Sequence, residues 1–440
     1  MILAAASTKT FDGFSIRGLN SRKPESPMTP RSQRTIGMTP TSGRERYQFL
    51  DVLRGFALFG IITANMILYS LYVDLPEAAQ ATLSTHATDR VLDFLELTFI
   101  EGKFYTIFSV LFGVGFSILL TRAQARTTSF QRFFLRRMSF LFLIGLAHAA
   151  LIWHDDILES YAVCGALLLP FVRARNRTII AFAVLALAAG AVIKLTNAIP
   201  HDSLTGPQHL LLARFGLAHA SEMETLAHGS LQNIFWMNLA HWFGQVDYLI
   251  SSGMILKIFG CFLLGFYVGR NEIYKRLEEY RPSIMRVAIV GLVIGIPLNL
   301  VYAYTFSFDQ SWVRDLSEAL GILPLSAGYA SLLCLLWLSP RWHGLLQGFA
   351  PVGRMALTNY VGQSVSCTLI FYGTGLGLGG RMGPTLYLPI GFAVYIAQIA
   401  LSRLWLNRFQ FGPLEWVWRM LTYGSWVPLM KPVNPTERIG

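Results

Sequence analysis

Long apolar segments recur along the chain from residue 50 to residue 406, with no long polar linker between them. A helix needs roughly 17 to 25 mostly apolar residues to cross the hydrocarbon core of a bilayer. Ten segments reach or approach that length, at 50–72, 104–120, 138–153, 158–172, 178–196, 249–269, 285–306, 316–338, 351–372 and 385–406. The pattern predicts an all-α integral membrane protein, a polytopic bundle of about ten transmembrane helices.

The segments around these helices divide the chain into three parts. Residues 1–46 are rich in Ser, Thr, Pro, Arg and Gly, which predicts a disordered, basic cytoplasmic tail. Residues 47–427 are expected to form a single transmembrane domain with a long extracytoplasmic segment at 197–247. Residues 428–440 then form a second cytoplasmic tail.

The placement of positive charge predicts the orientation of the helices. With the N-terminus inside and ten crossings, the loops on the cytoplasmic side carry most of the 36 Lys and Arg residues. The outer loops hold only Arg90, Arg214, Arg314 and Arg381. Cytoplasmic loops are the ones that accumulate Lys and Arg, so both termini are predicted to be cytoplasmic.

The composition is that of a membrane protein, and it indicates which partners the protein has. The chain is 53% hydrophobic and only 14% charged, against about 25% charged residues in soluble domains. The net charge of +11 follows from the cytoplasmic loops, where it matches anionic lipid. We therefore expect the lipid bilayer as partner and no nucleic acid, while oligomeric state cannot be deduced.

The first apolar segment, FLDVLRGFALFGIITAN, carries two charged residues, Asp51 and Arg54, and the amide residue Asn65. At 100° per residue they share one helical face, which lipid does not accommodate. One interpretation is an i,i+3 pair of Asp51 and Arg54 at the membrane interface, with Asn65 bonding another helix. The other is a polar shaft with Arg54 at its mouth, able to hold a phosphate.

The segment GLAHAALIWHDDILESYAVCG places His148 inside the third predicted crossing. Asp155, seven residues later, returns to nearly the same helical face, and Asp156 and Glu159 follow. A histidine inside the membrane with a carboxylate nearby is a candidate acid or base. The alternative is a buried histidine that only makes structural hydrogen bonds.

A third polar motif is GRMALTNYVGQS, in which Asn359 and Gln363 stand at i and i+4 and Arg354 lies at the cytoplasmic entry. Amide side chains that bond across helices explain this polar pocket without any chemistry.

No metal site is predicted from spacing. Five histidines lie in the outer segment, at His201, His209, His219, His228 and His241. No pair has the i,i+4 spacing of a helical metal site, and the four cysteines match no metal or redox motif. The amphipathic stretches of this segment indicate an interfacial lid instead.

Taken in order, LDVLRGFALFGIITAN, FYTIFSVLFGVG, GLAHAALIWHDDILESYAVCGALLLP, GRMALTNYVGQS and GPLEWVWRMLTY resemble the successive signatures of the YeiB family. They extend from about residue 46 to residue 424. The resemblance implies a multi-pass protein of the bacterial inner membrane, in a family whose function is largely unassigned.

The LDxLRG opening is also similar, more distantly, to the first helix of the integral-membrane acyltransferases. That superfamily includes the O-acyltransferases of bacterial envelope sugars and the heparan-α-glucosaminide N-acetyltransferases. In the O-acyltransferase pattern a histidine follows the arginine by 11 residues, and Asn65 holds that place here. This difference weakens the similarity to the O-acyltransferases. Heparan-type enzymes also have an asparagine there, so the similarity to those enzymes is not weakened.

The likeness implies acyl-CoA as donor and an envelope glycan or small molecule as acceptor. Chemistry then suggests the roles. His148 with Asp155 or Asp156 would be the general base, and His86 with Asp89 in the first outer loop is a second candidate. Asn65 would donate to the developing oxyanion. Arg54, held by Asp51, would bind the CoA phosphates or the thioester.

Two other functions compete with acyl transfer. A helical bundle with a polar shaft also suits a membrane transporter of a small solute, although no repeat of LDxLRG occurs. A scaffold for an envelope complex is the third alternative, and it predicts that the shaft tolerates alanine.

Overall fold

The computed structural model describes residues 47–124, 130–203, 205–306 and 311–431. These residues all belong to one compact unit, Met38–Gly440. The tail predicted at residues 1–46, and all but the first four residues of the tail predicted at 428–440, lie outside the described ranges.

Helices make up the regular structure of the described residues, which contain no strand. The first half of the chain forms α1 (Gln48–Tyr69), α2 (Glu77–Gln80), α3 (His86–Phe99), α4 (Lys103–Gln124), α5 (Phe130–Leu151), α6 (Leu158–Ala166), η2 (Leu169–Arg173), α7 (Asn176–Thr196), α8 (Gly206–Arg214) and α9 (Glu222–His228). The second half forms α10 (Leu231–Ser251), α11 (Met254–Arg270), η3 (Ile273–Lys275), α12 (Arg281–Phe306), α13 (Ser311–Trp337), α14 (Pro340–Leu346), η4 (Gln347–Phe349), α15 (Ala350–Arg354), α16 (Ala356–Phe371), α17 (Pro384–Arg408) and α18 (Pro413–Tyr423).

The all-α membrane architecture is confirmed, whereas the predicted count of about ten crossings and their orientation are not. Within the described residues, 7 helices are long and apolar enough to cross a membrane. The count rises to 8 if α10 and α11, which meet at a bend of 66°, form one broken span. The predicted crossings at 158–172 and 351–372 correspond to α6 and α16, with 9 and 16 residues, which are too short.

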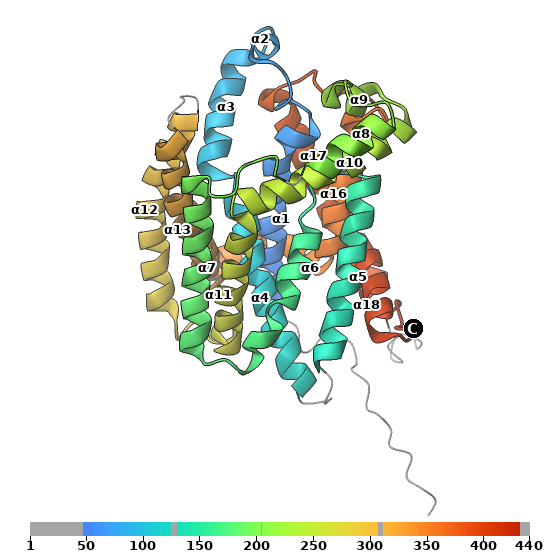
Figure 1. The fold of residues 1–440 in the computed structure, drawn as a ribbon. Coiled ribbons are helices and arrows are strands. Elements are labelled where there is room, and N and C mark those ends of the chain that lie inside the picture. The colour runs from blue at the N-terminus through green and yellow to red at the C-terminus, as the bar shows by residue number, and fades with distance from the viewer. Residues whose placement is uncertain (1–46, 125–129, 204, 307–310, 432–440) are drawn as a thin grey trace, which may run out of the picture. The chain divides into compact units, whose positions relative to one another are not determined.

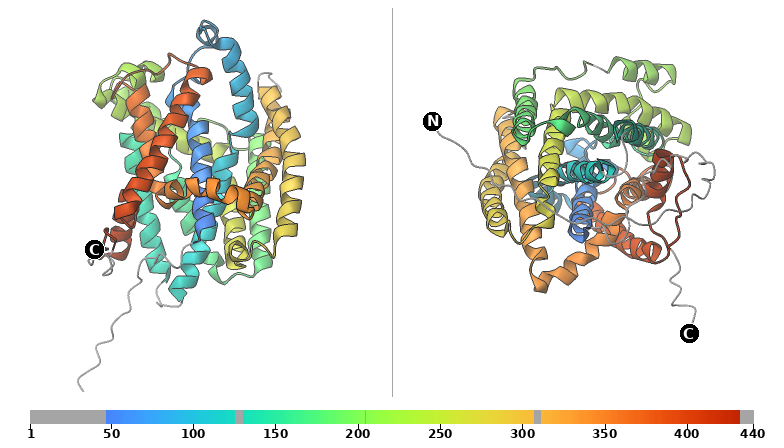
Figure 2. Two further views of the ribbon diagram at one scale, coloured as in Figure 1. Left: turned by 180° about the vertical axis from the view of Figure 1, so that it is seen from behind. Right: turned by 90° about the horizontal axis from the view of Figure 1, so that it is seen from below.

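The long helices run beside one another and the shorter ones close or cross the bundle. Helices α12 and α13 pack together at one edge, and α5 and α18 pack together at another (Figure 1). Helix α10, with α8 and α9, covers the end of the bundle from which α3 also projects (Figure 1). The short helices α14 and α15 run across the long ones (Figure 2).

Helix α12 shows why the chain needs lipid around it. Its outward face exposes large apolar side chains, among them Val287, Val290, Val293 and Ile294. Only 22% of its most apolar window is buried inside the protein. Water would not solvate such a surface, whereas acyl chains cover it at no cost.

Helices α4 and α11 approach so closely that their backbones touch. A Cβ on Gly113 would lie 2.0 Å from the carbonyl oxygen of Phe262, and one on Gly265 would lie 1.9 Å from that of Val110. Small residues are the usual means of close helix packing in membranes, because apolar burial gives little advantage there. This contact fixes α4, which forms one wall of the cavity described next.

Candidate functional site

A cavity of about 870 Å³ lies inside the bundle, between α1, α4, α5, α11 and α16. Its size falls within the range of roughly 300–1,000 Å³ that is typical of ligand sites. Predicted site residues from three separate sequence motifs line it: Asp51, Arg54, Asn65, Asp155 and Arg354. The fold therefore gathers into one space the polar residues that the sequence separates by hundreds of positions.

Helix α1 supplies one polar wall of the cavity. Arg54 Nη1 donates to Asp51 Oδ1 at 2.8 Å, so the expected i,i+3 pair is present. Asn65 lines the cavity from the same helix. Helix α15 fits against α1 because Gly353 has no side chain; a Cβ there would lie 1.8 Å from the Asp51 carbonyl oxygen. That contact brings Arg354 to the turn that carries Arg54.

One region of the cavity wall is rich in positive charge. It lies where α1 and α5 begin and α4 ends, and we call it the arginine end. Five arginines line it: Arg54, Arg122, Arg137, Arg354 and Arg419. The carboxylates in this part of the lining are those of Asp51 and Glu415. Because guanidinium groups match phosphates and carboxylates, an anionic ligand is favoured here.

Helix α18 holds the arginine end in shape. The guanidinium carbon of Arg137 lies 3.5 Å from the centre of the Trp418 ring, and Trp418 Nε1 donates to the Arg137 carbonyl at 2.9 Å. Glu415 accepts hydrogen bonds from the backbone N–H groups of Leu357 at 2.7 Å and Thr358 at 3.2 Å. It thereby satisfies the first N–H groups of α16, which packs on the same cavity.

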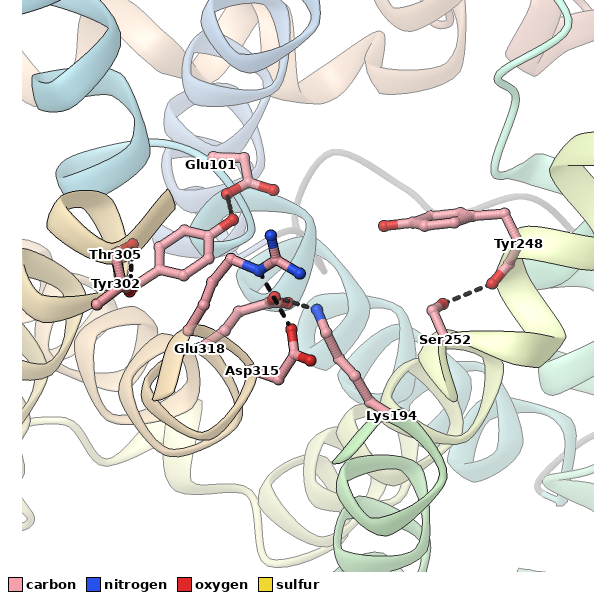
Figure 3. A network of polar contacts seen from close by, with 9 residues as sticks. Glu101, Lys194, Tyr248, Ser252, Tyr302, Thr305, Asp315 and Glu318 are labelled. Carbon is pink, nitrogen blue, oxygen red and sulfur yellow. Dashed lines mark hydrogen bonds and ion pairs between the residues drawn. The ribbon is translucent and has the colours of Figure 1, made fainter. Parts of the chain in front are cut away.

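A network of charged side chains lines another wall of the cavity (Figure 3). Lys194 on α7 pairs with Glu318 on α13, and Tyr302 donates to Glu101 at 2.6 Å. Lys257 lines the same wall. Charges inside a membrane protein are costly unless they pair, so this network is expected to fix α7 against α13.

A second pocket, of about 210 Å³, adjoins the cavity. Trp153 and Asp155 line both. The carboxylate and imidazole side chains around the second pocket are those of Asp74, His154, Asp155, Glu222 and His241. We call this group the histidine pocket. Glu222 of α9 and His241 of α10 line it, in the segment that the charge pattern predicts to be extracytoplasmic.

Glu222 connects two imidazoles in the histidine pocket. Its Oε2 lies 3.0 Å from His241 Nδ1, and its Oε1 lies 3.4 Å from His154 Nε2. The same His154 nitrogen lies 3.5 Å from Asp155 Oδ2. Segments that are far apart in the sequence, the loop after α5, the start of α9 and the middle of α10, therefore meet at one point.

The environment of the histidine pocket shifts its titrations. Burial, and then the charge of Glu222, raises the pKa of Asp74 to about 6. Burial disfavours the imidazolium of His154, but Asp155 and Glu222 outweigh it, so the pKa of His154 is raised. Burial likewise opposes the charge of Glu222, yet the hydrogen bond to His241 keeps its pKa lowered. Opposite charges thus stabilise one another here.

His148 belongs to a different cluster. Its Nδ1 lies 3.3 Å from Asp156 Oδ1, and both side chains are almost completely buried. Tyr360 donates to the same carboxylate oxygen at 2.8 Å. The predicted carboxylate partner of His148 is therefore Asp156. Tyr360 lines the cavity, whereas His148 and Asp156 are not among its lining residues.

The second predicted base lies elsewhere. His86 is the first residue of α3 rather than part of a loop. Asp89 accepts hydrogen bonds from Thr385 N at 2.9 Å and Thr85 Oγ1 at 2.7 Å, so it holds the beginning of α17. Neither His86 nor Asp89 is among the residues that line the two pockets described above.

The amide motif of α16 bonds to α17. Asn359 Nδ2 donates to Ser402 Oγ at 3.0 Å, and Gln363 Nε2 donates to Gln398 Oε1 at 3.1 Å. Gln398 Nε2 returns a hydrogen bond to the Asn359 carbonyl at 2.8 Å. The hydrogen bonds between helices that were predicted for this motif are therefore present.

The histidine pocket is what sequence reasoning missed. His154 stands directly before Asp155, but of the two histidines in GLAHAALIWHDDILESYAVCG only the intramembrane His148 was predicted as a site residue. Glu222 and His241 are separated from it by about seventy and ninety positions, so no local motif connects them. Glu318 offered a visible signal, since it is an acid inside the apolar segment 316–338.

Comparisons with known proteins place this arrangement in a family. The chain is 33% identical over 411 residues to the uncharacterized protein YxaH of Bacillus subtilis, covering 90% of this chain and 98% of the relative. It is 30% identical over 398 residues to the uncharacterized protein YeiB of Escherichia coli, covering 86% and 96%. The chain belongs to the YeiB-like family. Residues 268–425 match the family model described as a protein of unknown function, DUF418.

The family membership bears on the site in one respect. The matched region contains α15 to α18, and so includes Arg354, Glu415 and Arg419 of the arginine end. The histidine pocket lies before it in the sequence but within the span of the two bacterial relatives. Membership in this bacterial family agrees with a membrane protein, and the names of the relatives assign no reaction.

Proposed function

We propose that this YeiB-like protein is a membrane acyltransferase of the bacterial inner membrane. It takes an acyl group from acyl-CoA at the arginine end and passes it to an acceptor at the histidine pocket. The observation that supports this proposal is the single cavity of about 870 Å³ that has five arginines at one end and shares Trp153 and Asp155 with the histidine pocket at the other.

The arginine end suits the donor. CoA carries its phosphates at one end and its thioester at the other, on a long flexible arm. Guanidinium groups bind phosphates with paired hydrogen bonds, so the arginine end would hold the nucleotide. The apolar walls of α1 and α4 would then receive the arm and exclude water from the thioester.

The histidine pocket suits the acceptor. An acceptor hydroxyl or amine attacks the thioester carbonyl, and a C–O or C–N bond forms as the C–S bond breaks. The acceptor's proton passes to the carboxylate of Asp155, which lines both spaces, and a proton returns to the sulfur so that CoA leaves as a thiol. Asn65, on the cavity wall, would donate to the oxyanion.

Transport of a small anionic solute is the alternative. It is favoured by the same adjoining cavities, because they extend from the arginine end to the opposite side of the bundle. The two functions differ in what crosses the membrane. Acyl transfer moves only the acyl group, whereas transport moves a whole molecule.

Sealed inside-out membrane vesicles from cells that express the chain distinguish the two. They are given acetyl-CoA that carries one label in the acetyl group and another in the adenine. The proposal predicts that acetyl label enters an acceptor in the lumen or membrane while adenine label stays outside. Loss of acetyl transfer in Asp155→Asn is also predicted. Entry of both labels together, or no difference from vesicles that lack the protein, contradicts the proposal.

A further inference from the structure

Three side chains of the histidine pocket already stand where a metal ion would need them. One ligand atom from each of His154, Glu222 and His241 lies within 4.8 Å of the others. The contacts of Glu222 with the two imidazoles measure 3.0 and 3.4 Å. Ligand atoms that share one tetrahedral Zn²⁺ at about 2.0–2.1 Å lie about 3.4 Å apart. The two contacts reach different oxygens of Glu222, so the three side chains stand near a coordinated set and need a small adjustment to share one ion.

His154 is held in the tautomer that leaves Nε2 available. Its Nδ1 lies 3.3 Å from Asn238 Oδ1, and Asn238 Nδ2 donates to the Ile152 carbonyl at 3.3 Å. The second bond fixes the amide with its oxygen toward His154. Because that oxygen only accepts, Nδ1 must carry the proton. A hydrogen bond from the distal ring nitrogen is the usual support of a metal-binding histidine.

The position of the three residues also fits a site that ligands can reach. His154 is buried in the pocket, whereas Glu222 and His241 are half-buried at its edge. The pocket of about 210 Å³ leaves room for water or a substrate group beside an ion. Three protein ligands with one open position are the arrangement of catalytic zinc sites, including those built from two histidines and a glutamate.

We propose that His154, His241 and Glu222 bind a divalent transition-metal ion, with Zn²⁺ as the best fit, in the histidine pocket. Two imidazole nitrogens among three ligands favour Zn²⁺ over Mg²⁺ and Ca²⁺, which prefer oxygen ligands. Asp155 stands at the edge of this site. Binding of the ion stands on this geometry alone and goes beyond the proposed function.

The consequence for chemistry rests on the proposed function. A Zn²⁺ ion with an open position would bind the acceptor hydroxyl and lower its pKa. Asp155 would then take the proton from an acceptor already oriented toward the cavity. The metal test and the vesicle assay remain separable, since one measures a bound ion and the other a transferred acetyl group.

The test uses the full chain, purified in detergent with an affinity tag that contains no histidine. The protein is stripped with a chelator, dialysed and titrated with Zn²⁺ against a chromophoric competitor, and bound metal is counted by mass spectrometry. We expect about one Zn²⁺ per chain, retained in the presence of excess Mg²⁺ and Ca²⁺. His154→Gln and His241→Gln should each weaken binding at least tenfold.

Two further variants sharpen the result. Asn238→Leu removes the support of His154 without removing a ligand, and should weaken Zn²⁺ binding by about 10- to 100-fold. His219→Gln changes an exposed histidine of the same outer segment that lies outside the pocket, and should leave binding unchanged. Thermal unfolding and gel filtration check that each variant is folded.

The wild-type protein alone also decides the question if a variant fails to fold. X-ray absorption at the zinc edge should show two imidazole ligands and oxygen donors. The proposal is overturned if the wild type retains no Zn²⁺ after loading, or if binding survives in the His154→Gln/His241→Gln double variant. In that case the contacts of Glu222 with the two imidazoles alone account for the cluster.

Discussion

Asp155 and Asp156 are adjacent in the chain, yet their carboxylates belong to different clusters. Asp155 Oδ2 lies 3.5 Å from His154 Nε2 at the junction of the two pockets, whereas Asp156 Oδ1 lies 3.3 Å from His148 Nδ1 in the packed interior. The tight loop after α5 turns successive side chains in opposite directions. Under the proposed function, Asp155 takes part in the chemistry and Asp156 contributes to stability.

This difference gives a paired prediction. Asp155→Asn should reduce acetyl transfer in the vesicle assay by about 100-fold or more, the range for loss of a general base, with little change in thermal unfolding. Asp156→Asn should lower the free energy of unfolding by about 1–3 kcal/mol, because it disturbs the buried contacts with His148 and Tyr360. The reverse pattern would show that the two roles are wrongly assigned.

The glycines of α4 allow the cavity to be tested without disturbing the fold. Gly115 lines the cavity, and a Cβ there would meet nothing within 4 Å. Gly115→Leu should therefore keep the unfolding temperature of the wild type. Its side chain should fill the cavity, so that added acetyl-CoA no longer raises the unfolding temperature as we expect it to do for the wild type. Gly113→Ala, two residues away, should destabilise the protein by about 1–3 kcal/mol, because its Cβ would lie 2.0 Å from the Phe262 carbonyl oxygen.

A folded Gly115→Leu variant that still responds fully to acetyl-CoA would place the ligand elsewhere. A Gly113→Ala variant as stable as the wild type would show that α4 and α11 can separate without cost. Both results are read from thermal unfolding in the same detergent.

The ion pair of Lys194 and Glu318 predicts a non-additive effect on stability. Each side chain is about one-fifth exposed, at 23% and 17%. Lys194→Met or Glu318→Leu alone should lower the free energy of unfolding by about 1–3 kcal/mol, because each leaves an unpaired, partly buried charge. The loss is smaller than for a fully buried pair, since water still reaches the remaining charge. The double variant should be more stable than the sum of the two losses implies.

The matched control is a pair on the surface. Arg276 and Glu279 contact each other at 3.4 Å, with side chains 46% and 64% exposed. Glu279→Ala should change the free energy of unfolding by less than about 1 kcal/mol. If the loss of unfolding free energy in the Lys194→Met/Glu318→Leu double variant equals the sum of the two single losses, the two charges do not stabilise each other.

The sequence predicted the features that depend on short stretches of chain. The helical membrane class follows from apolar run length, and the pair of Asp51 and Arg54 follows from i,i+3 spacing. The number of crossings was harder to predict, because α16 is apolar enough but ends after 16 residues at Phe371. Apolar composition alone does not reveal such a short helix, since tertiary packing decides where the helix ends.

The histidine pocket could not be predicted from the sequence for a similar reason. His154, Glu222 and His241 meet only because the loop after α5 folds beneath α9 and α10. Their spacing carries no period of a helix or a turn, so local rules cannot detect it. His148 attracted the prediction because it is an ionisable residue in an apolar segment, but it lies in the packed interior beside Asp156 and Tyr360 and lines neither pocket.

Binding of acyl-CoA at the arginine end of the cavity is measured by thermal unfolding of the purified protein with acetyl-CoA. A ligand that binds only the folded state adds about 2.7 kcal/mol of stability at a concentration 100 times its Kd. We predict a saturable rise in unfolding temperature with acetyl-CoA and CoA that is lost in Arg54→Ala. No rise at millimolar ligand, or an equal rise in Arg54→Ala, would contradict the account.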